Sequence, residues 1–345
     1  MRLLLRSITA LAVFLTLTLG GCSSHAAVAE AGNAPMDYPA RDDVRSFIDE
    51  MVARHDFRRD DLHALFADVR QQTRVLEVIQ RPAEGKPWYQ YRPIFLNPAR
   101  IRQGTEFWAE HRELLERAEA TYGVPPEYLV AIIGVETFYG RHTGGFPVLD
   151  TLTTLGFDYP PRARFFRSEL EHFLLLTREE GLNPRGLEGS YAGAMGKSQF
   201  ISSSYRNFAV DFDGDGRRDL WESPADAIGS VANYFKRHGW VAGEPVTLPA
   251  RVEDEVAAPF AEKGMKPSFS LAELTAAGVE PLRPLSYDDN VALIALDGEE
   301  YREYWLGLRN FYVITRYNHS PLYAMAVHQL AQEIRQAYQR QEAAR

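Results

Sequence analysis

Apolar residues recur along much of this chain at the spacing of an α-helix that is buried on one face. Two early groups keep the i, i+3, i+4, i+7 spacing: Val44, Phe47, Ile48 and Met51, then Leu62, Leu65, Phe66 and Val69. Each such helix has an apolar stripe that another element must cover. At 345 residues the chain can hold two or three domains of packed helices. The spacing therefore predicts a mainly α fold.

A connector rich in Pro and aromatic residues is expected over about 81–98, and later segments return to the helical pattern. We expect one long helix over 98–122, with Phe107, His111, Leu114 and Ala118 on its buried stripe. Further helices are expected from Pro125-Pro126 onward, over 162–180, over 225–238, and from Ser320-Pro321 to the end. Residues 241–300 place Val, Leu and Pro between short polar turns, which favours a small β or mixed insertion.

The first residues have the organisation of an export signal. Arg2 and Arg6 precede a 12-residue, mostly apolar run from Ile8 to Leu19, which is too short to span a bilayer. The run ends in Leu-Gly-Gly-Cys22, which resembles the lipobox of bacterial lipoproteins, where the cysteine is acylated. In that pattern Ser23 favours the outer membrane. Residues 23–40 are rich in Ala, Gly, Pro and Ser and are expected to form a tether.

Charge and cysteine content exclude several classes. Removing Arg2 and Arg6 with the leader takes the formal charge from −9 to −11, which argues against a nucleic-acid partner. Cys22 is the only cysteine, so an intramolecular disulfide is impossible. The nine histidines show no metal-binding spacing, and the chain has no glycine-rich phosphate loop.

One carboxylate follows seven apolar residues in "LVAIIGVETFYGR". On a helix, Glu136 would share a face with Ile132, Ile133 and Gly140. A carboxyl group at the edge of an apolar wall is hard to ionise, so its pKa should rise and it could act as a general acid. Gly134 and Gly140 would leave room for a ligand. The alternative is a helix-terminal carboxylate that simply reaches water.

The stretch "DFDGDGRRDLWE" fits the calcium loop D-x-D-x-D-G-x5-E. The predicted ligands are oxygens of Asp211, Asp213, Asp215, Arg217 through its carbonyl, Asp219 and Glu222. Arg218 departs from the pattern, because paired loops place an aliphatic residue there. The chain has no second such loop, so we expect one structural calcium ion. A turn without a metal is the alternative.

Two further stretches carry polar and aromatic groups suited to a ligand. "GSYAGAMGKSQF" surrounds Ser190, Ser198 and Gln199 with small residues, although a plain flexible loop has the same composition. "YVITRYNHSPLY" offers Tyr317, Asn318 and Tyr323, which are typical of sugar-binding clefts. The alternative for the second stretch is a helix cap at Ser320 beside core tyrosines.

These stretches occur in one order, together with "GVETFYGR" and "ESPADAIGSVANYFKRHGW", and they closely resemble the membrane-bound lytic murein transglycosylase B family over about residues 40–340. The resemblance implies a mainly α (α+β) fold with a lysozyme-like helical core. The implied parts are a signal peptide 1–22, a tether 23–40, a helical N-terminal domain 41–105, a catalytic core with the calcium loop 106–240, a small β or mixed domain 241–300, and a return to the core over 301–345.

By the same resemblance Glu136 falls on the catalytic position. The implied substrate-binding residues are Arg162, Ser190, Gln199, Tyr234, Tyr317, Asn318 and Tyr323. The family's calcium loop looks longer than the standard one, which would put Asp226 in place of Glu222. Ser223-x-x-Asp226 also has the pattern of a helix capping box.

The implied reaction cleaves the β-1,4 bond between N-acetylmuramic acid and N-acetylglucosamine in peptidoglycan without water. Glu136 would protonate the glycosidic oxygen and then deprotonate the muramoyl C6 hydroxyl, which attacks C1 and leaves a 1,6-anhydromuramic end. Other cell-wall enzymes are further possible partners. The alternatives are a hydrolytic muramidase and a non-catalytic glycan-binding lipoprotein.

Overall fold

The computed structural model describes residues 36–80, 85–285 and 289–344. The expected signal peptide, Cys22 and residues 23–35 of the expected tether lie outside the described residues. The chain is mainly helical with two small antiparallel sheets, and the four early core positions of each expected stripe are buried as predicted.

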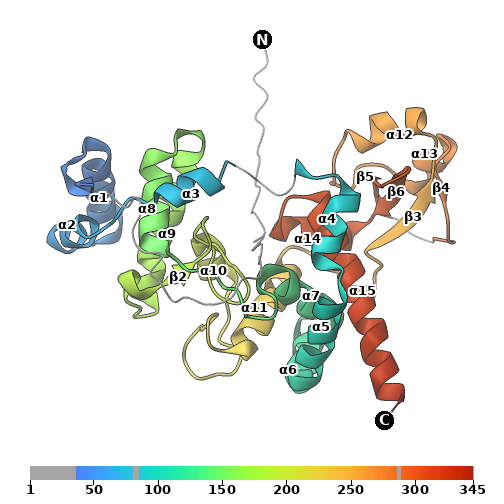
Figure 1. The fold of residues 1–345 in the computed structure, drawn as a ribbon, viewed down its shortest axis with the longest axis horizontal. Helices are drawn as coiled ribbons and strands as arrows, with labels where there is room; N and C mark the ends of the chain where they lie inside the picture. Colours follow the sequence, from blue (N-terminus) through green and yellow to red (C-terminus); the bar gives the residue numbers. More distant parts are fainter. Residues whose placement is uncertain (1–35, 81–84, 286–288, 345) are drawn as a thin grey trace, which may run out of the picture.

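One group of helices lies on the left of Figure 1. Its members are α1 (Asp42–His55), α2 (Arg59–Ala67), α3 (Thr73–Val78), α8 (Val148–Asp158) and α9 (Ala163–Glu179). Tyr38, which precedes α1, donates a hydrogen bond to Asp158 at the end of α8 (2.6 Å). His55 and Glu171 join α1 to α9 with 2.7 Å between Nε2 and Oε1. These polar contacts attach the first helices to the middle of the sequence.

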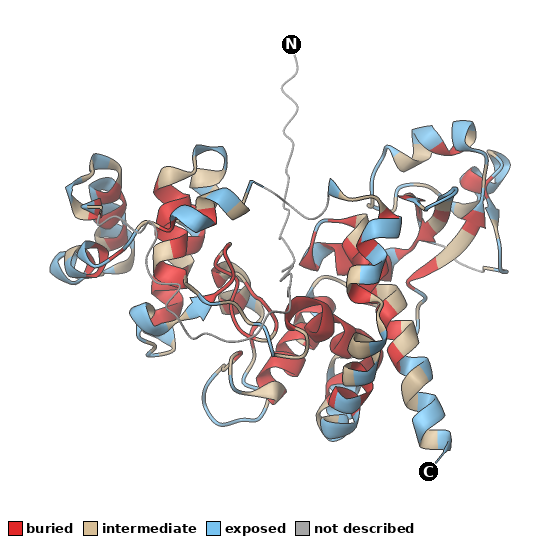
Figure 2. Cartoon of the chain, viewed as in Figure 1, coloured by how far each residue is buried: buried red, intermediate tan, exposed pale blue. Residues whose placement is uncertain are grey.

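A second group of helices forms the core on the right. Its members are α4 (Trp88–Phe95), α5 (Pro98–Glu110), α6 (Arg112–Tyr122), α7 (Pro126–Thr137), α14 (Arg309–Tyr317) and α15 (Pro321–Ala343). The long α15 packs along α5 and α7, and every residue of α7 is buried (Figure 2). The range 41–105 therefore contributes α1–α3 to the first group and α4 and α5 to this one.

Shorter elements lie between the two groups. They are α10 (Ser202–Phe208), α11 (Pro224–Arg237) and the strands β1 (Phe146–Pro147) and β2 (Glu188–Gly189), whereas the 3-10 turns η1 (Tyr38–Ala40), η3 (Pro160–Arg162) and η4 (Pro184–Gly186) pack on helices of the first group. The two strands pair antiparallel, with Phe146 opposite Gly189. This pairing brings the loop after β2 close to the segment that follows α7.

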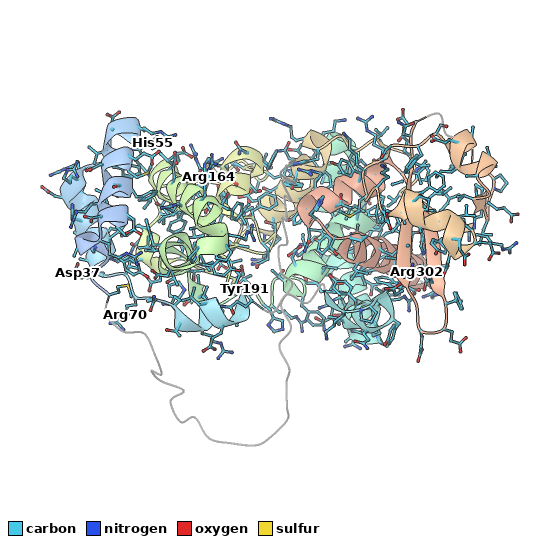
Figure 3. The ribbon with its side chains drawn as sticks, turned by 90° about the horizontal axis from the view of Figure 1, so that it is seen from above. Asp37, His55, Arg70, Arg164, Tyr191 and Arg302 are labelled. Carbon is cyan, nitrogen blue, oxygen red and sulfur yellow. The ribbon has the colours of Figure 1, made fainter. Side chains whose placement is uncertain are left out.

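A four-stranded antiparallel sheet forms the far end of the molecule. Its strands, in spatial order, are β4 (Glu280–Pro281), β3 (Thr247–Arg251), β6 (Arg302–Gly307) and β5 (Ala292–Asp297), with α12 (Asp254–Ala261) and α13 (Leu271–Ala276) packed beside them. The sheet has a small apolar core of its own, centred on Leu274, Leu293 and Leu306. Seen from above, Arg302 of this sheet and His55 of α1 lie toward opposite ends, with Tyr191 between them (Figure 3).

Two expectations for the N-terminal half are wrong. The helix expected over 98–122 is divided at His111, whose backbone (φ −111°, ψ 26°) leaves the helical region and whose ring packs on Phe107 with 4.4 Å between ring centroids. The break lets α5 pack on α15 while α6 packs on α11, and it places Leu115 rather than Leu114 in the core. In addition, the expected connector over 81–98 contains the helix α4, which tolerates Pro93 near its end.

Candidate active site

Glu136 lies in the last turn of the buried helix α7, with only 7% of its surface exposed. The helix ends one residue later, and Phe138 and Tyr139 follow with φ of 52° and 62°, a left-handed backbone that costs non-glycine residues energy. Gly140 is therefore not on the helix face of Glu136, contrary to expectation. The chain turns away sharply and leaves the carboxyl group at the end of the helix.

Gly134 does not leave room for a ligand, as the sequence suggested. A Cβ atom there would lie 2.6 Å from the hydroxyl of Tyr139. That hydroxyl donates a hydrogen bond to the carbonyl of Arg100 on α5 (2.7 Å). The glycine thus allows the strained turn after α7 to fold back on its own helix.

The phenol of Tyr323 donates a hydrogen bond to Oε1 of Glu136 at 2.5 Å. Tyr323 lies in the first turn of α15, where Ser320 caps the helix through the backbone N–H of Tyr323 (3.3 Å). Burial raises the pKa of Tyr323 well above its usual value, and the negative charge of Glu136 raises it further. The phenol therefore stays protonated and remains a donor to the carboxyl group.

Tyr317, at the end of α14, connects the acid to the loop 189–200. Its phenol donates to the carbonyl of Ser198 at 2.5 Å. Burial raises the pKa of Tyr317, as does the nearby charge of Glu136. The next residue of that loop, Gln199, has φ of 50°, and its side-chain amide donates to the carbonyl of Thr143 (2.9 Å). Three of the four non-glycine residues with positive φ among those described thus flank this site.

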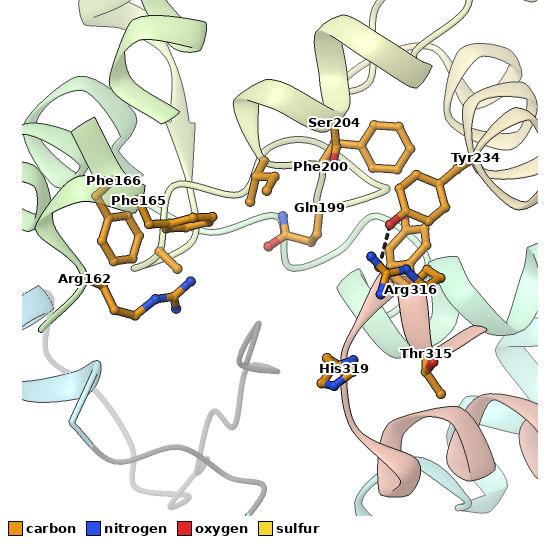
Figure 4. A pocket seen from close by; sticks show the side chains of 13 residues that line it. Arg162, Phe165, Phe166, Gln199, Phe200, Ser204, Tyr234, Thr315, Arg316 and His319 are labelled. Carbon is orange, nitrogen blue, oxygen red and sulfur yellow. Dashed lines mark hydrogen bonds between the residues drawn. The ribbon is translucent and has the colours of Figure 1, made fainter. Parts of the chain in front are cut away.

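A pocket opens beside these residues between the two groups of helices (Figure 4). Four of the predicted substrate-binding residues line it: Arg162, Gln199, Tyr234 and Tyr317. The guanidinium of Arg162 lies over the ring of Phe165 at 4.3 Å from the centroid. Burial lowers the pKa of Arg162. Arg316 projects from the opposite wall, and no Asp or Glu belongs to the described lining. The pocket therefore presents aromatic faces and positive charge.

The other predicted substrate-binding residues lie behind this lining. Asn318 is buried directly after Tyr317. The hydroxyl oxygen of Ser190 accepts hydrogen bonds from the N–H groups of Ala192 (3.3 Å) and Ala194 (3.0 Å), so it shapes the loop. Tyr234, within the lining, donates to the carbonyl of Arg316 at 2.5 Å, which fixes the wall opposite Arg162.

Sequence reasoning missed several lining residues. They are Phe165, Phe166, Ala192, Phe200, Ile201, Ser204, Thr315, Arg316 and His319. The Phe-Phe pair directly after Arg164, three residues past Arg162, was the available signal, since adjacent large aromatic residues after a charged turn suit a ligand wall as well as a core. Phe166 is in fact fully buried, so it belongs to the protein core as well as to the wall of the pocket.

The loop 211–222 brings carboxylates together, as a metal site requires. Oxygens of Asp211, Asp213 and Asp226 lie within 4.8 Å of one another. Asp226 is buried and accepts the N–H groups of Phe212 and Asp219, both at 2.7 Å. The side chain of Glu222 is exposed and outside this group.

Other predicted ligands shape the turn. Oδ1 of Asp215 accepts the N–H of Arg217 (2.9 Å), and Oδ1 of Asp219 accepts the N–H of Glu222 (2.9 Å). Oδ2 of Asp211 accepts the N–H of Gly216 (2.8 Å), and this bond lowers the pKa of Asp211. Acceptor-only carboxylates pointing into one turn are the hard oxygen donors that calcium takes.

The departure at Arg218 has a structural reason. Its Nε donates to Glu180 at the end of α9 (2.7 Å). Arg218, the eighth residue of the loop, thus joins the loop to α9. In a paired calcium loop the residue at this position would contact a second loop instead.

The calcium loop also contacts the pocket loop directly. The carbonyl of Leu220 accepts the N–H of Lys197 (2.7 Å), and the amine of Lys197 donates to the carbonyl of Trp221. A Cβ at Gly196 would lie 2.5 Å from that Leu220 carbonyl, so the two loops need a glycine at this contact. Disorder in the calcium loop would therefore break these contacts with Lys197, which directly precedes Ser198 and Gln199.

Comparison with known proteins yields one consistent family. The family model described as "Transglycosylase SLT domain" matches residues 39–332. The chain is 46% identical to membrane-bound lytic murein transglycosylase B of Escherichia coli (strain K12) over 308 residues, which cover 86% of this chain and 84% of the relative.

Solved structures agree with this match. Catenated lytic transglycosylase SltB1 from Pseudomonas aeruginosa shares 54% identity and a TM-score of 0.84, covering 88% of this chain and all of that one. The Escherichia coli lytic transglycosylase Slt35, solved in complex with calcium, shares 45% identity and a TM-score of 0.81, covering 89% and 96%. The fold class expected from the sequence, mainly α with a lysozyme-like core and a small β part, is confirmed.

Proposed function

The chain belongs to the transglycosylase SLT domain family and is a lytic murein transglycosylase, a lyase that acts on peptidoglycan, and on this premise we propose how its own residues carry out the reaction. The observation that carries the proposal is the buried contact between Tyr323 and Glu136, next to Tyr317 of the pocket lining. It holds a carboxyl group in one orientation where a glycosidic oxygen can be protonated.

We assign both proton transfers to Glu136. Its proton goes to the glycosidic oxygen of N-acetylglucosamine as the bond from that oxygen to C1 of N-acetylmuramic acid breaks. The carboxylate then takes the proton of the muramoyl C6 hydroxyl, whose oxygen bonds to C1 and closes the 1,6-anhydro ring. The acid is regenerated, and no water is consumed.

The lining favours this route over the hydrolytic muramidase. A conventional glycosidase needs a second carboxylate about 5–10 Å from the first. Glu136 adjoins the pocket next to Tyr317 and does not itself line it, and no second carboxylate is among the described lining residues. Glu169 is buried nearby, but its two oxygens accept the N–H and hydroxyl of Ser203 (2.9 and 2.8 Å). A nucleophile within the substrate removes the need for a second acid.

Glycan binding is assigned to the pocket and the residues behind it. Arg162, Gln199, Tyr234 and Tyr317 would contact the sugars, and Ser190, Asn318 and Tyr323 would hold the surrounding structure. A relative, SltB3 from Pseudomonas aeruginosa, was solved in complex with NAG-anhNAM-pentapeptide, at 34% identity to this chain and a TM-score of 0.74, covering 84% of this chain and 78% of that one. Stacking faces and amide groups in this pocket suit the same chemistry.

Mass spectrometry of muropeptides released from purified murein sacculi tests the reaction. Anhydromuropeptides as the main product support it. Products with reducing ends would establish the hydrolytic alternative, and binding of sacculi without any release would establish the non-catalytic one.

We propose one structural calcium ion in the loop 211–226. Asp211, Asp213, Asp215, the carbonyl of Arg217 and Asp226 would hold it, and the buried position of Asp226 favours it over Glu222 as the closing ligand. Asp219 would support the turn. The relative solved with calcium supports the choice of metal.

Membrane attachment is assigned to Cys22. No helix within the described residues is long and apolar enough to cross a membrane. The curated relative is named membrane-bound, and the lipobox-like sequence before Cys22 supports an acylated outer-membrane lipoprotein facing the periplasm. Cys22→Ala should move the protein from the membrane to the soluble fraction, and unchanged sedimentation with membranes would contradict the assignment.

A further inference from the structure

A second groove runs along α15 at the opposite end of α7 from Glu136. Two adjoining hollows form it, and they share Pro125, Glu127 and Arg335. One lies between α15, the start of α7 and strands β3 and β6, and the other lies between α15 and α5–α6. We call this surface the α15 groove. Glu136 follows Glu127 by nine positions of α7, or about 14 Å along the helix, so the groove is distinct from the pocket.

Four glutamines line the groove from one face of α15. Gln329, Gln332, Gln336 and Gln339 follow one another at spacings of three, four and three residues. Gln329 and Gln332 are half-buried, and Gln336 and Gln339 are exposed. The row is about 15 Å long. Gln329 accepts a hydrogen bond from Nε of Arg92 (2.7 Å) and Gln332 donates to the hydroxyl of Tyr128 (3.4 Å), and the remaining donors and acceptors of the row suit hydroxyl and acetamido groups.

Aromatic rings lie beside this row. Trp305 of β6 and Tyr338 of α15 are half-buried, so part of each ring stays accessible. Tyr128 and Trp240 form the wall behind them, and the hydroxyl of Tyr128 is 2.9 Å from Nδ1 of His328. Rings that combine an apolar face with a polar edge are suited to sugars, which have both kinds of surface.

Charge separates the α15 groove from the pocket. The described lining of the two hollows holds four arginines and five glutamates, and the most buried acid, Glu127, is paired with Arg335 (3.1 Å). The pocket lining has two arginines and no acid. A balanced, amide-rich surface favours a neutral ligand over a strongly charged one.

We propose that the α15 groove binds a neutral stretch of N-acetylated glycan, separately from the strand that is cut in the pocket. The identity of the ligand rests on the proposed function, whereas its chemical class rests on the lining. Because α7 and α15 both extend from the groove to Glu136, a bound strand would keep the enzyme on its polymeric substrate.

The test uses the full chain carrying Glu136→Gln, so that substrate is not consumed. N-acetylglucosamine hexamer and protease-treated sacculi are the probes, with binding measured by calorimetry and by sedimentation. The test variant adds Gln332→Ala and Gln336→Ala, which keep helix propensity. The matched control adds Gln341→Ala, an exposed glutamine of α15 that lines neither hollow.

The glutamine pair should weaken binding to sacculi about fivefold to thirtyfold, since two amide contacts are lost, while Gln341→Ala leaves it unchanged. The hexamer should slow hydrogen exchange over residues 329–339. Equal binding by both variants, or binding that needs untreated sacculi with attached protein, would overturn the proposal. In a chain that keeps Glu136, the variant with Gln332→Ala and Gln336→Ala should cleave small soluble muropeptides at the wild-type rate. Turnover by Glu136→Gln itself would instead refute the proposed function.

Discussion

The two walls of the pocket are built differently. On the side of α7, α14 and α15, buried Tyr317 lines the pocket and donates to the carbonyl of Ser198, and next to it buried Tyr323 donates to Glu136. On the side of η3 and α9, Arg162 rests on the rings of Phe165 and Phe166 at 4.3 and 5.1 Å, and the described residues include no ion pair for it. The first wall fixes one carboxyl group, and the second presents charge and flat surface.

This difference separates chemistry from recognition. A proton donor must be held at a defined angle to the bond it cleaves, which requires buried, paired groups. A wall that recognises a long polymer needs contacts that form and break as the strand moves. We therefore expect changes in the acid wall to lower kcat, and changes in the arginine wall to raise KM.

The largest effect is expected for Glu136→Gln, which breaks the acid wall at its centre. Glutamine keeps the shape but cannot deliver the proton, so turnover of sacculi should fall by about 10²–10⁴. The melting temperature should hardly change, because no cavity forms.

Glu169→Gln is the matched control, since it alters another buried acid beside the pocket. The Glu169→Gln variant should turn over sacculi at the wild-type rate per folded molecule. If Glu169→Gln were inactive and Glu136→Gln active, the acid would be on the arginine side and the comparison would be reversed.

The second prediction concerns the calcium loop, which contacts the loop 189–200 between the two walls of the pocket. Asp226→Ala should abolish the rise in melting temperature that calcium produces, whereas Glu222→Ala should keep it. A site that binds only the folded state adds about 2.7 kcal/mol at a hundredfold excess of metal over Kd. Each variant must be compared with and without calcium, because Asp226 also accepts two backbone N–H groups. The reverse pattern would make Glu222 the closing ligand.

Much of this architecture could be predicted from local sequence. The early helices, the burial of α7 and the carboxylates of the calcium loop all follow from spacing within one segment. The contact of Tyr323 with Glu136 joins residues 187 positions apart, and no local pattern specifies it. The break at His111 depends on α5 and α6 having different partners, which is again a tertiary effect.

Two glycines and one arginine show the same limit to what local sequence can predict. Gly134 is required by the hydroxyl of Tyr139, although the sequence suggested that it leaves room for a ligand, and Gly196 is required by the carbonyl of Leu220. Arg218 is explained only by Glu180 on α9. In each case the partner is set by packing between elements.

A third, smaller effect is expected for Tyr323→Phe. The change removes the donor to Oε1 of Glu136 and keeps the ring, so kcat should fall about tenfold to hundredfold, as for a lost bond to a charged group. Tyr317→Phe is the matched control, because its phenol donates to a backbone carbonyl instead. Equal losses in both variants would show that the tyrosines support the wall as a whole and not the carboxyl group in particular.

The smallest effect is expected on the arginine wall. Arg162→Ala should raise KM for sacculi about threefold to tenfold and leave kcat nearly unchanged, because only binding contacts are lost. Arg162→Lys should recover little, since an ammonium group cannot reproduce the contact of the guanidinium with the face of Phe165. Arg164→Ala, at an exposed position outside the lining, should behave as wild type. A fall in kcat at constant KM for Arg162→Ala would place this residue at the reacting bond, and the division of labour between the two walls would then be wrong.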